Sequence, residues 1–418
     1  MLPGTDVAIV GAGPYALSLA AHLRARGVEH RVFGRKMQFW LDMPEGINLK
    51  SFAFATNVYV PARGYGFAEW CRENHLEDFE PCTMASFARY GLWVQSRLVP
   101  YVEASLVTRV SRQNDGRFEV LLSDESVVVA NRVVFATGLS YCEYVPSTLR
   151  GLPRELASHT SEHRSYAQFR GKDVAIIGGG ASAIEAGALV HEAGGRPQIL
   201  VRDELAHFST RLPAERSLYS RMRNPISVLG PSMKSRLLQA LPFSVRFLPE
   251  QARLNFVKHS YGPSAPWWIA PRVWGRVPIF VQTTVKAAEV SGSRVRLKIH
   301  ESAYGDRTIE VDHVIAGTGF VSDVDRLQYL EDALKRSLRR VESAPWLSVN
   351  FESSVPGAYF LGPITAFCFG PLYRFVAGAE YAAPAVARHL AGPVRAVTSA
   401  VRRRILRRED AVAAGAMA

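Results

Sequence analysis

Two stretches of the chain have the residue types and spacing that can hold the pyrophosphate of a dinucleotide. Residues 6–20 read DVAIVGAGPYALSLA, and residues 173–189 read DVAIIGGGASAIEAGAL. In both, a G-x-G-x-x-A pattern directly follows an apolar run that is typical of a strand buried on both faces. The pattern leads into a helix whose first N–H groups and positive dipole end attract phosphates. One such match is weak evidence, but two in one chain predict two dinucleotide sites.

Each position of the pattern has its own physical role. The first glycine allows a tight turn from strand to helix, and the second lets the backbone approach a pyrophosphate. The small third residue lets the helix pack closely on the strand. The cofactor-binding residues predicted in the two loops are Gly11, Gly13 and Ala16 in the first and Gly178, Gly180, Ser182 and Ala183 in the second.

The end of the second strand in each unit is the position at which a ribose-binding acid is usual, about 20 or more residues after the first glycine. The first unit has Gly34 and then Arg35 at this position, and the second unit has Arg202. An arginine in place of an acid favours a 2′-phosphate, so the second unit is predicted to bind NADPH rather than NADH. For Arg35 the alternatives are stacking on an adenine ring and contact with a phosphate.

Residues 36–60 lack a clean periodicity and are rich in aromatic and turn-forming residues. We expect this segment to be a loop packed over a cofactor rather than a regular element, with Trp40 in contact with the cofactor. The segment also contains Asn48 and Lys50, for which an ordinary loop position is the competing interpretation.

The length, composition and cysteine content of the chain narrow the class of protein further. Its 418 residues suggest two or three domains, and 48% hydrophobic with 21% charged residues is usual for a soluble globular protein. Only five residues precede Asp6, too few for a signal peptide, and no apolar run approaches the ~20 residues that span a bilayer. The four cysteines form no C-x-x-C pair and indicate reduced thiols. We therefore expect a cytoplasmic protein without a transmembrane segment or a metal site.

The formal net charge is +12. Arginines crowd residues 393–418, and basic residues far outnumber acidic ones in residues 206–275. The alternatives are a solvated basic face, an anionic substrate, a phosphate-bearing cofactor or weak attraction to acidic surfaces. No nucleic-acid fold signature accompanies the charge, so DNA and RNA are not expected partners.

The alternation of strand-like and helix-like patterns predicts an α/β fold with two Rossmann-like dinucleotide-binding domains. Residues 152–170 are predicted to be a connector, in which His159 and His163 lie four apart without a third residue to complete a metal site. Residues 206–275 are rich in prolines, tryptophans and arginines and interrupt the alternation of strand-like and helix-like segments. They are predicted to be an inserted lid or substrate region. The other predicted elements are helices at 67–74, 84–99 and 372–390 and strands at 29–33, 106–131, 133–138, 278–285 and 294–299.

Two later strands end in Ala-Thr-Gly or Gly-Thr-Gly, and a Phe-Leu-Gly-Pro stretch precedes the last predicted helix. Together with the two glycine loops, these features resemble two-dinucleotide-binding flavoproteins. More narrowly, the chain is similar to class B flavin-dependent monooxygenases, namely flavin-containing monooxygenases and the lysine and ornithine N-hydroxylases of siderophore synthesis. A further likeness is to bacterial FAD-dependent urate hydroxylases. The cofactor-binding residues implied at these strand ends are Thr137, Gly138, Thr318, Gly319, Gly362 and Pro363.

The resemblance implies that the first unit binds FAD, that the second binds NADPH, and that the FAD-binding domain is discontinuous. Two departures matter: Gly34 replaces the ribose-binding acid, and the F-x-G-x-x-x-H fingerprint of Baeyer–Villiger enzymes is not found before the second unit. Ester-forming chemistry on ketones is therefore not expected. The implied division is 1–165 and 311–392 for FAD, 166–310 for NADPH with the insert at 206–275, and a basic tail at 393–418.

The resemblance also implies the chemistry. NADPH reduces FAD, the reduced flavin reacts with O2, and a flavin hydroperoxide transfers one oxygen to a nucleophilic nitrogen, sulfur or carbon. Asn48-Leu49-Lys50 resembles the stretch of the N-hydroxylases whose lysine lies near flavin, nicotinamide and substrate. Lys50 is therefore the expected catalytic cation, and Asn48 is the expected hydrogen-bond donor.

The expected substrate is small, contains nitrogen and carries an acidic group. Arginines bind carboxylates and other anions, aromatic faces bind planar or apolar groups, and the insert combines both. A solvated surface is the alternative for its arginines, and the sequence leaves homo-oligomerisation open. The arginines considered for the anion are Arg211, Arg216, Arg221, Arg223, Arg236, Arg246, Arg253 and Arg272.

Other protein classes share the same pair of folds. Disulfide reductases need two cysteines beside the flavin, and the chain has no C-x-x-C or C-x-x-x-x-C pair. A dehydrogenase that passes electrons from NAD(P)H to a quinone or a protein partner remains an alternative, for which the basic tail would suit docking at a membrane surface. Two intact glycine loops argue against a redox sensor without catalysis.

Overall fold

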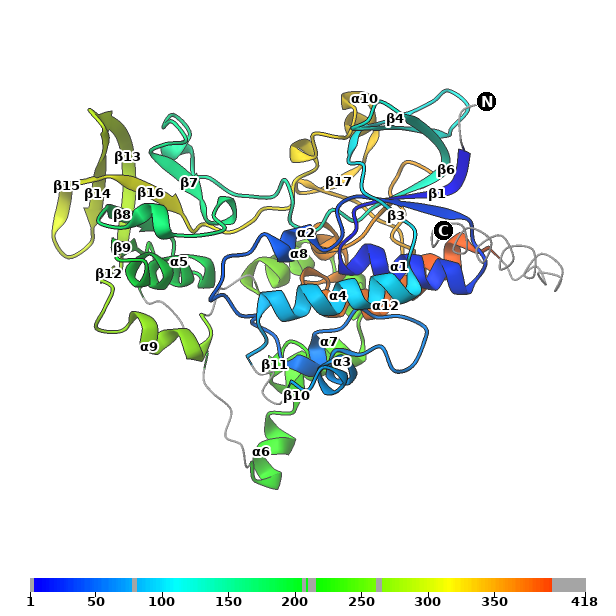
Figure 1. The fold of residues 1–418 in the computed structure, drawn as a ribbon, viewed down its shortest axis with the longest axis horizontal. Helices are drawn as coiled ribbons and strands as arrows, with labels where there is room; N and C mark the ends of the chain where they lie inside the picture. The colour runs from blue at the N-terminus through cyan, green and yellow to red at the C-terminus, as the bar shows by residue number, and fades with distance from the viewer. Residues whose placement is uncertain (1–3, 77–80, 205–207, 210–215, 261–264, 393–418) are drawn as a thin grey trace, which may run out of the picture.

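The computed structural model describes residues 4–76, 81–204, 208–209, 216–260 and 265–392. Its elements form two lobes, each with its own parallel-stranded sheet and helices beside it (Figure 1). The predicted α/β fold with two Rossmann-like units is confirmed.

The first lobe is built on a seven-stranded sheet around β1 (Gly4–Val10). This strand lies between β2 (His30–Phe33) and β6 (Val127–Phe135), and the three run parallel. All residues of the apolar run from Val7 to Val10 are buried, as expected for a central strand that is covered on both faces. The sheet is completed by β3 (Val102–Glu103), β4 (Val107–Arg112), β5 (Phe118–Leu122) and β19 (Ala358–Phe360).

The C-terminal part of the chain completes this N-terminal sheet. β19 pairs in parallel with β6, so that Phe360 lies opposite Phe135, and their rings are 4.8 Å apart. On the same edge of β6, opposite β1, β5 pairs with the earlier residues of β6, and β5 and β4 form the predicted antiparallel strands.

The second lobe repeats the arrangement with a five-stranded parallel sheet. β8 (Asp173–Ile177) lies between β9 (Arg196–Leu200) and β16 (His313–Ala316), as β1 lies between β2 and β6. The outer strands are β12 (Ile279–Phe280) and β7 (Ala157–His159). Both β7 and β16 lie outside the range 166–310, although the division of the chain into cofactor-binding domains remains a prediction. An antiparallel sheet of β13 (Thr283–Ser291), β14 (Arg294–Glu301) and β15 (Gly305–Val311) packs beside them.

Most of the predicted helices are present. α3 (Phe67–Glu73) and α4 (Met84–Leu98) match the predicted ranges, and the Thr83 side chain caps α4 by accepting a hydrogen bond from the backbone of Ser86. The helix predicted over 372–390 is wrong in its first part, because α12 covers only Ala379–Leu390. Two 3-10 turns precede it. The remaining α-helices are α1 (Pro14–Ala25), α2 (Gln38–Leu41), α5 (Ala181–Glu192), α6 (Leu218–Arg223), α7 (Met233–Ala240), α8 (Glu250–His259), α9 (Ala270–Val273), α10 (Asp332–Ser337) and α11 (Ala366–Phe369). Within the described ranges, no helix is long and apolar enough to cross a bilayer.

Much of the predicted insert packs on the first lobe. Val228 and Leu254 belong to the same buried cluster as the residues of β1, and the Arg253 guanidinium donates to the carbonyl of Phe367 at 2.8 Å. Two short strands, β10 (Ile226–Ser227) and β11 (Gly230–Pro231), form a hairpin in this region. Arg211 and the basic tail at 393–418 lie outside the described residues.

Candidate functional site

Both glycine loops open on one cavity of about 2150 Å³ between the two lobes. Its lining includes Gly11 and Gly13 from the first loop and Gly178 and Gly180 from the second. A pocket for one drug-sized ligand is typically about 300–1,000 Å³. This cavity therefore has room for two extended cofactors and a small substrate.

The first glycine of each loop is required by the same close approach. Gly11 has φ +115°, and a Cβ there would lie 2.4 Å from the carbonyl oxygen of Ala136. Gly178 has φ +135°, and a Cβ there would lie 2.4 Å from the carbonyl oxygen of Gly317. Each loop thus packs against the end of the adjacent parallel strand, which places the two helix N-termini at the cavity.

The second glycine of the first loop faces empty space. A Cβ on Gly13 would meet no protein atom within 4 Å, so the packing of the protein itself does not demand glycine there. Gly13 and Gly180 are the N-cap residues of α1 and α5, and neither helix has a side-chain cap. The first N–H groups of both helices are therefore available to phosphate oxygens. These features fit a dinucleotide in each loop.

The structure brings most of the predicted site residues to this cavity. Ala16 and Ala183 instead lie fully buried behind the loops, as their packing role requires. Asn48 forms an isolated bridge with Thr83, whereas its neighbours Leu49 and Lys50 line the cavity. The predicted residues that line it are Gly11, Gly13, Arg35, Trp40, Lys50, Thr137, Gly138, Gly178, Gly180, Ser182, Arg202, Thr318, Gly319, Gly362 and Pro363.

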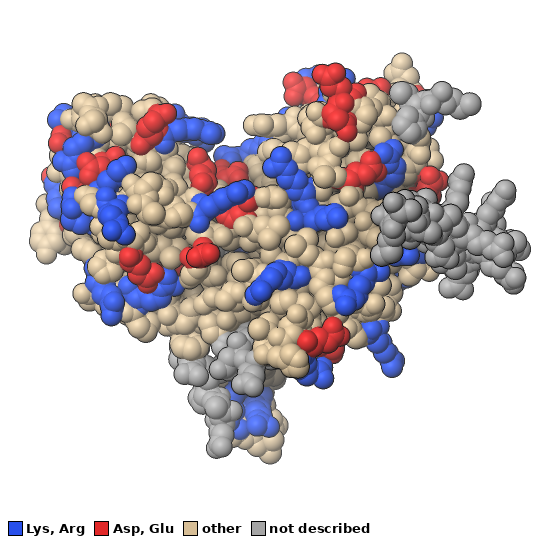
Figure 2. Space-filling model, in the orientation of Figure 1, with Lys and Arg blue, Asp and Glu red and all other residues tan. Residues whose placement is uncertain are grey.

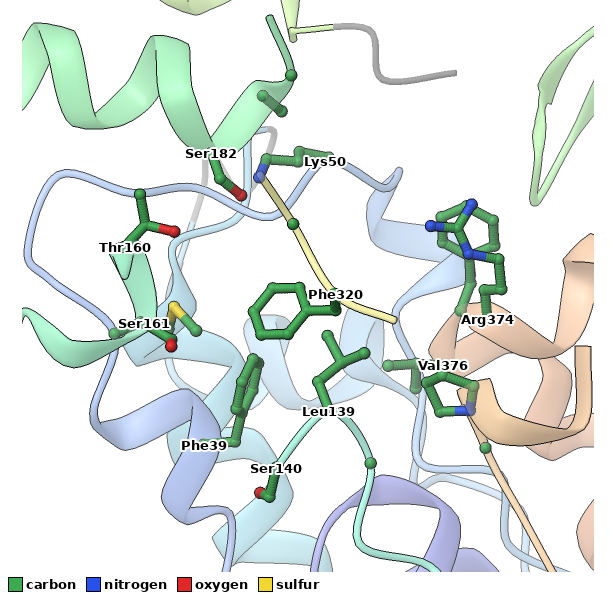
Figure 3. A pocket seen from close by; sticks show the side chains of 18 of the residues that line it. Phe39, Lys50, Leu139, Ser140, Thr160, Ser161, Ser182, Phe320, Arg374 and Val376 are labelled. Atoms are coloured by element: carbon green, nitrogen blue, oxygen red, sulfur yellow. The ribbon is translucent and has the colours of Figure 1, made fainter. Parts of the chain in front are cut away.

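Lys50 forms an ion pair that joins the two lobes. Its Nζ lies 2.8 Å from Oε2 of Glu185, a residue of α5 whose side chain is only 3% exposed. Figure 3 shows Lys50 beside Ser182, which comes from the start of the same helix. Burial raises the pKa of Glu185, and the charge of Lys50 opposes that rise. The expected catalytic cation therefore already has a counter-charge.

Glu185 was missed by the sequence reasoning. Its second carboxylate oxygen, Oε1, is buried and has no hydrogen-bond partner among the described residues, and Glu185 itself lines the cavity. A buried acceptor without a donor is costly in free energy, so a donor supplied by a bound ligand would stabilise it. The signal in the sequence is a single acid inside the otherwise apolar run AIEAGAL.

Aromatic and apolar side chains enclose the middle of the cavity. Phe39 and Phe320 meet edge to face with ring centroids 6.2 Å apart, and Leu139 lies next to them (Figure 3). Trp40 packs edge to face on the buried ring of Phe87 at 4.9 Å. Such a lining excludes water from a reacting centre.

Arg374 brings a cation to another part of the cavity wall (Figure 3). The backbone on either side of it is fixed by the Tyr15 hydroxyl, which approaches the carbonyl oxygens of Tyr373 at 2.9 Å and Phe375 at 2.8 Å. Tyr15 belongs to the first turn of α1, so the first glycine loop and the Arg374 segment are held together. Glu185 and Asp203 are the acids in the described lining, and both lie beside cations, Lys50 and Arg202.

The described arginines of the insert do not line the cavity, which corrects the expectation that they contact the substrate there. Arg272 instead pairs with Glu192 through two 2.7 Å hydrogen bonds and donates to the carbonyl of Gly46 at 2.9 Å. It therefore ties α9 to the segment that carries Lys50. Arg246 lies over the ring of Phe369 at 5.1 Å, and Arg253 donates to backbone carbonyls.

The two histidines of the connector have different partners. Nε2 of His159 lies 3.0 Å from the carbonyl oxygen of Gly319, whereas His163 belongs to a buried hydrogen-bond chain. The Ser158 hydroxyl lies 2.8 Å from Nε2 of His163 and 2.7 Å from Nε2 of His313. The Gln168 amide lies 3.0 Å from Nδ1 of His163. Burial is the main cause that lowers the pKa of His163 to about 4, so its ring is neutral at pH 7. Among the described residues, no three potential ligands are grouped as a metal site would require.

Comparison with known proteins places this architecture among flavoproteins. Residues 8–227 match the family model described as pyridine nucleotide-disulphide oxidoreductase. The indole-3-pyruvate monooxygenase of Oryza sativa is 28% identical over 47% of this chain and 47% of its own length. The FAD-dependent urate hydroxylase of Xanthomonas campestris is 26% identical over 47% and 45%. The chain thus spans about half the length of the curated relatives it matches, and the resemblance to class B monooxygenases is confirmed.

Solved structures share the fold over nearly the whole chain. Ornithine hydroxylase from Pseudomonas aeruginosa has a TM-score of 0.73 at 18% identity, over 93% of this chain and 99% of its own. Ornithine N-hydroxylase from Kutzneria, in a structure with reduced FAD, NADP+ and L-ornithine, has a TM-score of 0.70 at 18% identity, over 96% and 100%. Bacillithiol disulfide reductase from Staphylococcus aureus has a TM-score of 0.65 at 16% identity, over 93% and 98%. The same fold is therefore shared by hydroxylases and by a disulfide reductase.

Proposed function

The chain belongs to the pyridine nucleotide-disulphide oxidoreductase family, and we propose that within it the protein is an FAD- and NADPH-dependent monooxygenase. Its proposed reaction inserts one oxygen atom of O2 into a small nitrogen-containing substrate. The alternative, which shares the fold, is a dehydrogenase or reductase that passes electrons from NAD(P)H to a quinone or a protein partner.

One observation carries the proposal: both glycine loops open on the same cavity, and its described lining contains no cysteine. A dithiol mechanism needs a reactive thiol beside the flavin. Instead, all four cysteines are buried, and burial raises the pKa of each thiol, most clearly of Cys82 and Cys142, to about 12. These thiols are therefore poor nucleophiles at neutral pH, which favours oxygen over a disulfide as the acceptor.

The residues present fit both cofactors. FAD and a nicotinamide cofactor are also what the Kutzneria structure contains. We assign FAD to the first loop, where the open space at Gly13 admits a pyrophosphate and Arg35 reaches the same cavity. We assign NADPH to the second loop, where the guanidinium of Arg202 is 80% exposed and suited to bidentate contact with a 2′-phosphate. When bound, FAD accepts a hydride and activates O2.

The protein contributes orientation and exclusion of water. Phe39, Leu139 and Phe320 keep the centre of the cavity apolar, which protects a reactive oxygen species from water. Lys50 supplies positive charge, held in place by Glu185, and Oε1 of Glu185 is an acceptor for a ligand amine or amide.

For the substrate we propose an anionic group that binds Arg374. This residue takes the role first expected of the insert arginines, because it lines the cavity and its backbone is fixed by Tyr15. Arginine matches the geometry of a carboxylate with two parallel hydrogen bonds.

The test has two parts. In the first, the purified protein is reduced anaerobically with NADPH and then exposed to O2. In the second, amino acids, purines, polyamines and thioethers are each added as substrates, and mass spectrometry detects any oxygenated product. The proposal expects a gain of one oxygen atom on an anionic nitrogen compound, and Arg374→Ala should raise its KM by about tenfold or more. Electron transfer to a quinone without any oxygenated product would instead establish the dehydrogenase alternative. Oxygenation of neutral or cationic compounds alone would refute the role of Arg374.

A further inference from the structure

The described part of the insert carries a surface that combines positive charge with exposed apolar side chains. We call residues 216–249 the basic apolar patch. The segment contains six lysines and arginines and no aspartate or glutamate. Its basic residues are Arg216, Arg221, Arg223, Lys234, Arg236 and Arg246.

The apolar residues of the patch fall on defined helix faces. On α6, Leu218 and Met222 lie four residues apart and are 75% and 68% exposed. On α7 and just beyond it, Met233, Leu237 and Leu241 follow at intervals of four and are 57%, 57% and 54% exposed. Residues four apart share one face of a helix, so each helix presents an apolar stripe to solvent.

Nine apolar side chains are exposed within this one segment. Single exposed apolar residues are ordinary, but a contiguous group marks a surface that binds a partner. In Figure 1, α6 projects from the body of the molecule, and in Figure 2 the visible atoms at this projection are blue and tan. The other strongly exposed apolar side chains of the segment are Tyr219, Ile226, Phe247 and Leu248.

We propose that the basic apolar patch binds the surface of an anionic lipid bilayer. Short amphipathic helices with lysines and arginines beside leucine, methionine and phenylalanine insert their apolar face at the headgroup boundary. Anionic headgroups attract each nearby basic residue. The charge of the patch argues against a second copy of the chain, because a symmetric contact would place cations against cations without any acid from the segment.

The patch is anchored to the body and adjoins the cavity. Val228 belongs to the buried cluster of the first lobe, and Nζ of Lys234 lies 4.3 Å from the ring centroid of Phe256 on α8. In the β10–β11 hairpin, Ile226 is 42% exposed, whereas residues 228–231 line the cavity. A bilayer bound to the patch would therefore lie beside one wall of the cofactor cavity.

The test is co-sedimentation of the full chain with vesicles of neutral phosphatidylcholine and of phosphatidylcholine with 30 mol% phosphatidylglycerol. The choice of about 30 mol% gives the negative surface potential that attracts basic segments. We expect binding to the anionic vesicles only, and weaker binding at high salt. Two variants address the patch: Leu218→Ser with Met222→Ser, and Arg221→Glu with Arg223→Glu. Each should weaken binding by about tenfold or more.

Matched controls lie on other surfaces. Arg150→Glu with Arg154→Glu makes the same charge change at two exposed arginines at the start of the connector and just before it. Tyr304→Ser removes a side chain that is 83% exposed in the second lobe. Both controls should bind as the unchanged chain does. All variants keep residues 393–418, so any contribution of the tail to vesicle binding is the same in each. Thermal midpoints within a few degrees of that of the unchanged chain exclude misfolding of the variants.

Three outcomes overturn the proposal. The first is an unchanged chain that does not bind anionic vesicles. The second is binding that both patch variants retain, which would assign it to another surface. The third is self-association that the patch variants abolish in sedimentation equilibrium, with no vesicle binding, which would identify a second copy as the occupant.

Discussion

Replacing Lys50 with methionine should destabilise the protein in a pH-dependent way, because it removes the ion-pair partner of the buried Glu185 carboxylate. Two unit charges 2.8 Å apart attract by roughly 6 kcal/mol at an effective dielectric constant near 20. Lys50 is 38% exposed, so water screens part of this attraction, and desolvation of Glu185 offsets more. We therefore expect the Lys50→Met variant to lose about 3 kcal/mol of unfolding free energy at pH 8.

The loss should shrink as the pH falls. Burial raises the pKa of Glu185, and removal of Lys50 removes the main influence that opposes that rise, while the charge of Arg272 remains. A carboxyl group with a raised pKa stabilises the fold below its unfolded pKa, and this contribution is lost as the pH rises through the folded value. Protonation of Glu185 as the pH falls from 8 to 5.5 recovers part of this loss, by up to ~1.36 kcal/mol for each pH unit below its raised pKa. The destabilisation should therefore be clearly smaller at pH 5.5 than at pH 8.

Urea unfolding at both pH values measures the effect, with Glu185→Gln and the double variant completing a cycle. Glu185→Gln removes the buried charge, so Lys50→Met should cost little when it is added to that background. The reasoning fails if Lys50→Met lowers the unfolding free energy equally at pH 8 and pH 5.5. It also fails if Lys50→Met costs as much in the Glu185→Gln background as in the unchanged chain.

Three further predictions follow from the loops and the connector. Gly13→Val should abolish FAD copurification, because its side chain would fill the space where the pyrophosphate is expected, while circular dichroism stays unchanged; a fully yellow variant would refute the assignment. Arg202→Ala should raise the KM for NADPH by about tenfold or more and leave that for NADH nearly constant, and equal effects would contradict a 2′-phosphate site. The buried His163, whose pKa lies at about 4 instead of its usual 6.5, stabilises the neutral-pH fold fully above about pH 6.5 and loses that contribution as the pH falls towards 4. His163→Gln should therefore reduce the acid-induced drop in thermal midpoint over this range, and an unchanged drop would exclude His163 as its source.

The sequence predicted those features that depend on local spacing. The apolar run before Gly11 became the central strand β1, and the same run before Gly178 became β8, because an unbroken apolar run is stable only where both faces are covered. Gly11 and Gly178 have positive φ, and a Cβ at either position would collide with the backbone that follows the adjacent strand. Only glycine fits there. The helix predicted from residue 372 failed because Gly370 and Pro371 begin a series of tight turns, which an apolar composition does not reveal.

Contacts between residues far apart in the sequence determine where the charged side chains of the cavity lie. Nothing in the segment around Lys50 predicts that it meets Glu185, which is the one acid in the apolar run AIEAGAL of α5. The Tyr15 hydroxyl likewise fixes residues on both sides of Arg374, although these lie at the opposite end of the chain. Residue type and spacing along the chain predicted the two dinucleotide loops, because each strand, glycine loop and helix are consecutive within about 20 residues. The tertiary structure alone decided which charges face the cavity, since the partner that holds each charge comes from another lobe or another segment.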